Sequence, residues 1–234
     1  MERIVDITFR NKTSHLSTCL TMVNILDSIY KNKKPDDIVI LSAGHGGLAL
    51  YTVLEKYMSN VNAENLYLKH GVHPHRDIEN GIHVSTGSLG CGILVAVGYA
   101  IANRSRDVHV VLTDGECAEG SVWEALSFAH THKLENLKVH VNVNGYSAYG
   151  SVDKLYIWMR LKSFLWSTKI WFTKTPDVSF LRGLQAHYHV MNEGNKEEIL
   201  NYINEEGVCK HVVRTYEERL SNFLNYCRSW IWRP

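Results

Sequence analysis

Residues 108–120 read Val-His-Val-Val-Leu-Thr-Asp-Gly-Glu-Cys-Ala-Glu-Gly, and the fold prediction rests on this stretch. The apolar run Val108–Thr113 is the best candidate for a buried strand in the sequence, and it ends at Asp114-Gly115. Ser121–His132 has the pattern of a helix, and Val139–Val143 has that of the next strand. A strand–helix–strand unit of about 35 residues has the proportions of a crossover between two parallel strands.

The same alternation of helices and short strands extends towards the N-terminus. Thr18–Lys31 predicts a helix, Ile38–Leu41 predicts a strand, and the glycine-rich residues 42–47 predict a turn that leads into a helix ending near Tyr57. Gly90–Ala102 is small and apolar on nearly every face, which predicts a helix buried in the core. The fold class that follows is α/β, a mainly parallel sheet with helices on both faces.

Beyond residue 150 the pattern weakens. Residues 156–172 are rich in Trp, Leu, Ile and Lys but have no clear period. Glu197–Asn204 predicts a short helix, and Val212–Val213 predicts part of a strand. Since no repeat or linker interrupts the chain, we expect a single domain over residues 1–234, with a divergent C-terminal element from about residue 151.

Composition narrows the class of protein. The chain has 234 residues, 45% of them hydrophobic, and a formal net charge of +1, so it has no electrostatic footprint for nucleic acid. Its five cysteines have no metal-ligand spacing and predict reduced thiols. Residues 1–30 lack the layout of a signal peptide, and no apolar run reaches bilayer length. We therefore expect a cytoplasmic protein that does not bind membranes.

Polar residues follow both strands of the predicted crossover. Asp114 ends the first strand, and Asn144 ends the second. Carboxyl ends of neighbouring parallel strands meet at one edge of the sheet, where α/β proteins bind ligands. A carboxylate and an amide oxygen suit Mg²⁺ or Ca²⁺, and Gly115 would let the backbone approach a phosphate. Singly, Asp-Gly and Asn-Gly are ordinary turn signals, so the metal hypothesis rests on the pair.

The sequence resembles the thiamine diphosphate enzymes, and their transketolase branch fits best. These enzymes carry a Gly-Asp-Gly motif that ends in Asn about thirty residues later, and residues 113–144 match it with Thr in place of the first Gly. Four more motifs match in the family's order over roughly residues 10–150. They are Ser14-His15 before a helix, Leu41-Ser42-Ala43-Gly44-His45 for Ser-x-Gly-His, Gly71-Val72-His73-Pro74 for Gly-His-Pro, and residues 85–92 for Thr-Gly-Ser-Leu-Gly-Gln-Gly.

The resemblance implies a site for thiamine diphosphate and Mg²⁺ (or Ca²⁺). Its metal ligands would be Asp114, Asn144 and the backbone carbonyl of Tyr146. Of the cofactor-binding residues, His45 and Gly115 would contact the diphosphate, and Gly87 to Leu89 would lie near the rings. The full set implied is His45, Gly87, Ser88, Leu89, Gly115, Glu116 and Asn144.

The resemblance also implies roles in catalysis and assembly. His15 and His73 would face the reacting centre, where histidines move protons on substrate hydroxyls near neutral pH. Glu119 would be the buried acid at a contact between subunits. For each histidine an ordinary capping or loop position is the alternative, and a His-x-His pair also suggests zinc. His75 and His83 match no motif, and no further ligand at zinc spacing accompanies them.

Several positions depart from the family pattern. Asn142 stands where relatives place Asp, so a charge near the metal is lost. Cys91 replaces Gln or His near the cofactor rings, and Ala148 and Tyr149 replace the usual residues after the metal-binding Asn. In the tail, Ile231 aligns with a histidine that reaches the diphosphate.

The chain is too short to hold the second, pyrimidine-binding domain that carries the family's activating glutamate. We therefore expect the diphosphate-binding subunit of a split, transketolase-like enzyme. It would be active only with a partner subunit, in an assembly with two copies of each chain, and would transfer a two-carbon ketol unit between sugars or sugar phosphates. Two alternatives remain: a degenerate, non-catalytic partner that keeps the fold, and a thiamine-dependent decarboxylase or 2-oxoacid dehydrogenase component. The three matched histidines argue against the second alternative.

Overall fold

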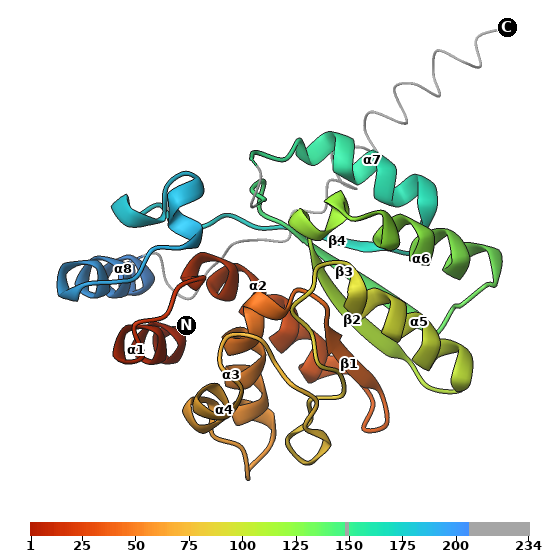
Figure 1. Ribbon diagram of the computed structural model, residues 1–234, viewed down its shortest axis with the longest axis horizontal. Coiled ribbons are helices and arrows are strands. Elements are labelled where there is room, and N and C mark those ends of the chain that lie inside the picture. The colour runs from red at the N-terminus through yellow and green to blue at the C-terminus, as the bar shows by residue number, and fades with distance from the viewer. Residues whose placement is uncertain (148–149, 206–234) are drawn as a thin grey trace, which may run out of the picture.

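A four-stranded parallel sheet forms the centre of the protein, as a computed structural model describes it for residues 1–147 and 150–205. The strands lie side by side in the order of the chain (Figure 1). They are β1 (Ile38–Leu41), β2 (Val108–Thr113), β3 (Leu137–Val143) and β4 (Lys169–Phe172). All three neighbouring pairs are parallel, so the carboxyl ends of the four strands share one edge.

Helices cover both faces of the sheet, which confirms the predicted α/β class. One face carries α1 (Glu2–Arg10), α2 (Leu16–Asn32), α3 (Gly47–Tyr57), α4 (Ala63–His70) and α8 (Glu193–Glu205). The other carries α5 (Cys91–Ala102), α6 (Gly120–Thr131) and α7 (Lys154–Phe164). Single turns of 3₁₀ helix follow two strands at the carboxyl edge, η1 (Gly44–Gly46) after β1 and η3 (Gly115–Ala118) after β2.

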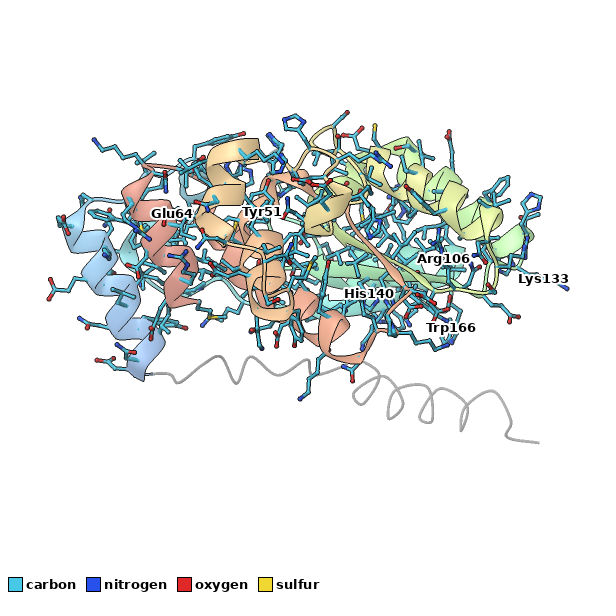
Figure 2. All side chains as sticks on the ribbon, turned by 90° about the horizontal axis from the view of Figure 1, so that it is seen from below. Tyr51, Glu64, Arg106, Lys133, His140 and Trp166 are labelled. Carbon is cyan, nitrogen blue, oxygen red and sulfur yellow. The ribbon has the colours of Figure 1, made fainter. Side chains whose placement is uncertain are left out.

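Each face of the sheet has its own hydrophobic core, because successive side chains of a strand point to opposite faces. Val39, Leu41 and Val111 pack under α2 and α3, whereas Val110 and Leu112 pack under α5 and α6. Side chains fill the space between the sheet and both helix layers (Figure 2). Burial of these apolar groups supplies the main driving force for the fold.

Most of the elements predicted from the sequence are confirmed. The three predicted strands and the helices before, between and after them lie where expected, within a few residues. α8 is longer than the predicted Glu197–Asn204 helix, and α1 and α4 were not predicted. The segment without a clear period contains α7 and β4, and β4 extends the sheet beside β3. Val212–Val213 and the tail lie outside the described residues.

The prediction that α5 is buried on nearly every face is wrong. Ile93 and Ala96 pack against the sheet with no exposed surface, but Leu94, Val95 and Ile101 are each 40–45% exposed. A helix that covers one face of a sheet buries only the stripe that meets the strands. The outer stripe of α5 is therefore an apolar surface of this chain. Within the described residues, no helix has the length and apolar character needed to cross a membrane.

A chain of polar side chains crosses the sheet inside the core. The indole N–H of Trp171 donates to His140 Nδ1 at 3.2 Å, and His140 Nε2 lies 3.3 Å from His109 Nδ1. An indole only donates, so neutral His140 must carry its proton on Nε2 and donate it to His109. His109 then has its own proton on Nε2, which lies 3.7 Å from Asp37 Oδ2. Trp171 thus fixes the tautomers of both histidines.

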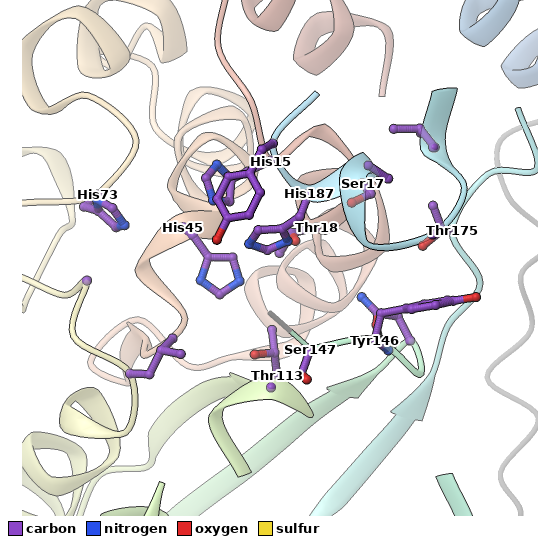
Figure 3. A pocket seen from close by; sticks show the side chains of 18 residues that line it. His15, Ser17, Thr18, His45, His73, Thr113, Tyr146, Ser147, Thr175 and His187 are labelled. Carbon is purple, nitrogen blue, oxygen red and sulfur yellow. Dashed lines mark hydrogen bonds between the residues drawn. The ribbon is translucent and has the colours of Figure 1, made fainter. Parts of the chain in front are cut away.

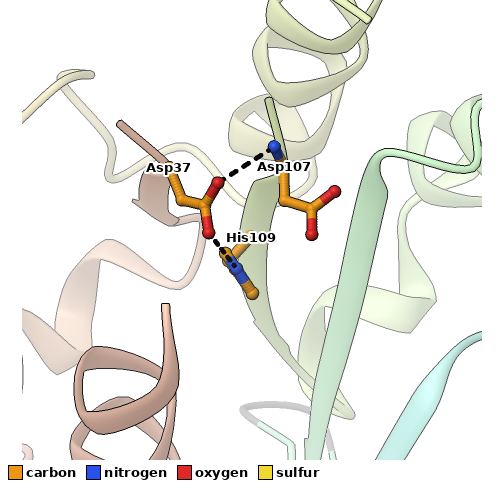
Figure 4. A group of neighbouring side chains, drawn as sticks. All are labelled: Asp37, Asp107 and His109. Carbon is orange, nitrogen blue, oxygen red and sulfur yellow. Dashed lines mark hydrogen bonds and ion pairs between the residues drawn. The ribbon is translucent and has the colours of Figure 1, made fainter. Parts of the chain in front are cut away.

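The same tautomers argue against a metal beside Asp37. Among the side chains that the structure describes, Asp37, Asp107 and His109 are the one group of three acidic or histidine residues whose ligand atoms lie close together, all within 4.8 Å (Figure 4). A metal bound to His109 Nε2 would move the proton of His109 to Nδ1, which would then donate to His140 Nε2. His140 would have to carry its own proton on Nδ1, where it would face the N–H of Trp171 with no acceptor between them. The group also lies at the amino end of β2, away from the edge where Asp114 lies. We interpret it as a structural cluster in which the carboxylate of Asp37 faces the N–H of a neutral imidazole.

Replacing Trp171 by Phe should lower the free energy of unfolding by about 1–3 kcal/mol, because buried His140 Nδ1 would lose its donor. Trp166→Phe is the matched control, since that indole is 69% exposed. Urea unfolding of both variants provides the comparison. Equal stability losses in the two would show that the hydrogen bond to His140 contributes nothing.

Candidate functional site

A pocket opens at the carboxyl edge of the sheet, where segments from seven parts of the chain converge (Figure 3). Its walls come from the start of α2, from η1, from the loop after α4, from the loop before α5, from the ends of β2 and β3, and from residues after β4. The lining residues with candidate roles are His15, His45, His73, Gly87, Leu89, Gly115, Asn144, Tyr146 and His187. The motifs that the sequence places far apart therefore meet at one site.

Asp114 is connected directly to the loop that follows β3. Its carboxylate is 2% exposed and accepts hydrogen bonds from Gly115 N at 3.1 Å and from Gly145 N at 2.7 Å. Asn144 lines the pocket, and its Oδ1 accepts from Tyr146 N at 2.9 Å. The ends of β2 and β3 therefore lie together, as predicted. Asp114 itself is not among the residues that line the pocket.

The donor groups at these strand ends suit a hard divalent cation. The candidates are the Asp114 carboxylate, the Asn144 side-chain amide and the Tyr146 carbonyl, which is the donor chemistry that Mg²⁺ and Ca²⁺ prefer. The carbonyl of Gly145 already accepts from Val152 N at 2.9 Å. Burial raises the pKa of Asp114 to about 6, against the opposing effect of the two backbone N–H donors. A bound cation would compensate for the cost of an ionised carboxylate in this buried position.

Close backbone packing positions the loop before α5. A Cβ on Gly44 would lie 2.7 Å from backbone atoms of Thr86 and Gly87, so only glycine fits between η1 and this loop. Gly87 in turn packs on the ring of His73, which a Cβ there would approach to 3.3 Å. Three of the family motifs are therefore in direct contact with one another.

Three histidine rings cluster at the mouth of the pocket. His15 lies 4.5 Å from His187 and 5.7 Å from His45, measured between ring centroids. Burial and the neighbouring histidines lower the pKa of His15 to about 4 and that of His45 to about 3. Both rings are therefore neutral at pH 7. Nδ1 of His15 shares a hydrogen bond with Ser14 Oγ at 2.7 Å, so Nε2 is the nitrogen that His15 offers to a bound molecule. His73 lines the same pocket and lies to the left of His15 and His45 in Figure 3.

His187 is a site residue that the sequence analysis missed. It belongs to a 3₁₀ turn after β4, and its carbonyl accepts a hydrogen bond from His15 N at 3.1 Å. The only sequence signal was the run His187-Tyr188-His189, in a region without clear periodicity. Ile231, the position where a histidine was expected, lies outside the described residues. His75 and His83 do not line the pocket.

Glu116, which was expected to contact the cofactor, does not line the pocket. Its side chain is fully buried beneath the site. Oε1 accepts from Ser42 Oγ at 2.7 Å and from Gly90 N at 2.9 Å, and Oε2 accepts from Thr113 N at 3.3 Å. Glu116 thus joins the ends of β1 and β2 to the loop before α5. Burial raises the pKa of its carboxyl to about 7.

Two further residues that were expected at the site, Ser88 and Glu119, do not line the pocket. Ser88 is exposed and outside the pocket, between Gly87 and Leu89, which do line it. Glu119 is half-buried at the start of α6, where its side chain lies against Gly90. Glu119 is therefore close to the exposed stripe of α5.

Asn142, a departure from the family pattern, has a structural explanation. It is fully buried, its amide donates to Thr21 Oγ1 at 3.0 Å, and its Oδ1 accepts from Thr173 Oγ1 at 2.5 Å. The Thr21 hydroxyl donates to the Thr18 carbonyl, so Oγ1 needs a donor from position 142, which an aspartate could not supply. The amide therefore links α2 to β3 and to the segment after β4. Ala148 and Tyr149, which also depart from the pattern, lie outside the described residues.

Comparison with known proteins identifies the family. Residues 5–170 match the model of the transketolase, thiamine diphosphate binding domain. One subunit of the apulose-4-phosphate transketolase of Phocaeicola vulgatus is 30% identical over 174 residues, which cover 66% of this chain and 61% of that protein. The chain belongs to the transketolase family and carries its thiamine diphosphate-binding domain.

Solved structures agree with this assignment. Transketolase from Leishmania mexicana is similar with a TM-score of 0.56 and 27% identity, over 70% of this chain and 29% of that one. A transketolase variant from Pichia stipitis, at 20% identity, shows the same fold with a TM-score of 0.68 over 98% of this chain and 44% of its own. The chain thus spans less than two-thirds of each of these relatives.

Glu116→Gln should change how stability depends on pH. Folding raises the pKa of this carboxyl from 4.5 to about 7, so the folded state holds the proton more tightly than the unfolded state. The wild type therefore loses stability, on the order of 3 kcal/mol, as the pH rises through this range. The variant lacks this titration, so its stability relative to the wild type should rise between pH 4 and pH 8.

Urea unfolding of both proteins at several pH values measures this difference. At pH 4 the two proteins should have similar stability, because the protonated carboxyl of Glu116 and the amide of the variant each turn a hydrogen towards one of the three donors. Glu124→Gln on the exposed side of α6 is the control and should give a constant difference. A constant difference for Glu116→Gln as well would mean that the buried carboxyl does not titrate in this range.

Proposed function

We propose that this chain is the diphosphate-binding subunit of a split, transketolase-like enzyme that transfers a two-carbon ketol unit between sugars or sugar phosphates. The observation that carries the proposal is the position of His15, His45, His73 and His187 in one pocket with the Asp114–Asn144 strand ends. A diphosphate at the strand ends would place the rest of the cofactor beneath the histidines. When bound, thiamine diphosphate supplies the carbon nucleophile of the reaction.

The residues of this chain would hold the cofactor in the following way. Asp114, Asn144 and the carbonyl of Tyr146 would bind Mg²⁺. Gly115 and His45 would contact the diphosphate, and the backbone of the Gly87–Leu89 loop would lie against the rings. The Glu116 carboxylate, which accepts from Gly90 N, would keep that loop in position. His187 supplies a further donor beside His45, with ring centroids 5.6 Å apart.

The histidines would then act on the substrate. A ketol transfer between sugars removes and returns protons on hydroxyl groups next to the carbon–carbon bond that breaks. Histidine side chains are suited to this task because an imidazole that accepts a proton can return it later. His15 and His73 both line the pocket and are our candidates for these steps. A decarboxylase has no need of such a set of hydroxyl-facing histidines.

A partner subunit would complete the enzyme. The chain spans 61% of the length of the related apulose-4-phosphate transketolase chain, which is itself one subunit of its enzyme, and transketolases extend well beyond this domain. The exposed stripe of α5, with Leu94, Val95 and Ile101, starts next to the loop that lines the pocket. We propose that the partner covers this stripe and brings its activating glutamate near Glu119. The assembly would contain two copies of each chain and act in the cytoplasm.

Co-expression with a pyrimidine-binding chain tests the function directly. The complex should transfer a ketol unit from a ketose donor to an aldose acceptor in the presence of thiamine diphosphate and Mg²⁺. His73→Ala should lower turnover by about a hundredfold to ten-thousandfold, the usual contribution of an acid–base group, while cofactor affinity stays within about threefold. His75→Ala, two residues away and outside the pocket, is the control.

Turnover and calorimetric cofactor affinity of the two variants separate the outcomes. Loss of cofactor binding in His73→Ala would make this histidine a structural residue and would weaken the sugar-transfer proposal. Robust transfer by the single chain without a partner would refute the split arrangement.

The partner surface can be tested separately. Leu94→Glu should abolish assembly with the partner, because a buried, unpaired carboxylate at an apolar contact is strongly unfavourable. The free chain should stay folded, since Leu94 is already 45% exposed. Leu68→Glu on α4, 69% exposed, is the matched control. Sedimentation of the co-purified chains measures assembly, and an intact complex with Leu94→Glu would place the contact elsewhere.

A further inference from the structure

A lysine lies against the loop that carries the proposed metal ligands. Lys154 is the first residue of α7, and its side chain passes over Gly145, where φ is +94°. A Cβ on Gly145 would lie 2.6 Å from Lys154 Cε and 3.4 Å from its Nζ. Gly145 N is the donor that binds Asp114 Oδ2. The ammonium group is therefore separated from the Asp114 carboxylate by a single glycine.

This position is unfavourable for a positive charge unless an anion is near. The first turn of a helix carries the positive end of its dipole, and Lys154 is also partly buried. The Asp153 side chain accepts hydrogen bonds from N–H groups of this turn and offsets part of the cost. Within residues 1–147 and 150–205, Nζ has one protein acceptor at the limit of hydrogen-bond distance, the carbonyl of Thr173 at 3.5 Å. Charge attraction to Asp114 favours the charged form of Lys154. For Asp114 the same attraction adds to the larger effect of its two backbone donors, Gly145 N and Gly115 N.

A groove joins this lysine to the candidate site. Lys154 lines it together with Asn144, Gly145 and Tyr146, and Asn144 and Tyr146 also line the main pocket. Lys174 lies on the same groove but is exposed. The ammonium of Lys154 thus faces the metal-binding loop from the side opposite the histidines.

We propose that the ammonium group of Lys154 is a fixed positive charge beside Asp114, and that this charge lowers the affinity of the site for a free divalent metal. The inference rests on the proposed function, because it takes Asp114 and Asn144 as the metal ligands. A monovalent charge so close repels a divalent ion, and it already neutralises part of the carboxylate. The metal would then bind well only together with the diphosphate, whose negative charges attract both cations.

Titration of the full chain with Mn²⁺ alone tests the inference, with free Mn²⁺ measured by electron paramagnetic resonance. Lys154→Met removes the charge and keeps the stem, so it should bind Mn²⁺ about tenfold more tightly, within the range that residues near metal ligands exert. Lys154→Gln should also bind Mn²⁺ more tightly than the wild type. Agreement between the two variants would show that the change does not come from a folding defect in one of them. Lys174→Met should bind like the wild type.

Asp114→Asn separates the inference from the function on which it rests. If this variant loses Mn²⁺ binding and the Lys154 variants bind no more tightly than the wild type, the role of Lys154 is refuted and the metal site stands. If Asp114→Asn binds Mn²⁺ as well as the wild type, Asp114 is not a metal ligand, and the proposed function fails with it. Tighter binding in both Lys154 variants, with loss in Asp114→Asn, supports the inference.

Discussion

The parallel pairing of β2 with β3 is the constraint on which the rest of the site depends. Its register sets Thr113 opposite Asn142, so that Asp114 and Asn144 leave the sheet at the same level. A shift of one residue would turn every side chain of β3 to the other face and would separate the two strand ends. The apolar residues that alternate across both cores fix this register. Hydrophobic burial on two faces thus determines where a carboxylate and an amide meet.

Above the sheet, buried polar groups rather than apolar packing hold the loops of the site. Glu116 binds three donors from three segments, and Asn142 connects α2, β3 and the chain after β4. Such groups define a geometry sharply, because each unpaired donor or acceptor in a buried place costs free energy. The two hydrogen bonds of Asn142 also explain why an asparagine can stand here in place of the family's aspartate, since both of its polar atoms have partners.

The sequence was sufficient for β1, β2 and β3, for the crossovers between them and for most of the residues that line the pocket, but not for β4. Short apolar strands and glycine-rich motifs are local signals, and His15, His45 and His73 lie in such motifs. His187 could not be predicted, because long-range contacts and not a local pattern bring it to the site. The outer stripe of α5 was misjudged for a related reason, since composition cannot show which face of an apolar helix meets the sheet. Glu116 carried the right type of side chain in the right motif, but only the structure shows that it points beneath the pocket.

The hydrogen bond from His15 N to the carbonyl of His187 joins residues 172 positions apart in the chain. Closing so long a loop costs entropy that only the contacts made afterwards repay, and contacts of this kind form late in folding. The sheet and its crossovers consist of shorter loops and can form first. During synthesis, the segment that carries His187 also emerges after all four strands. The wall of the pocket is therefore expected to be the last part of the molecule to assemble, and the first to open when stability falls.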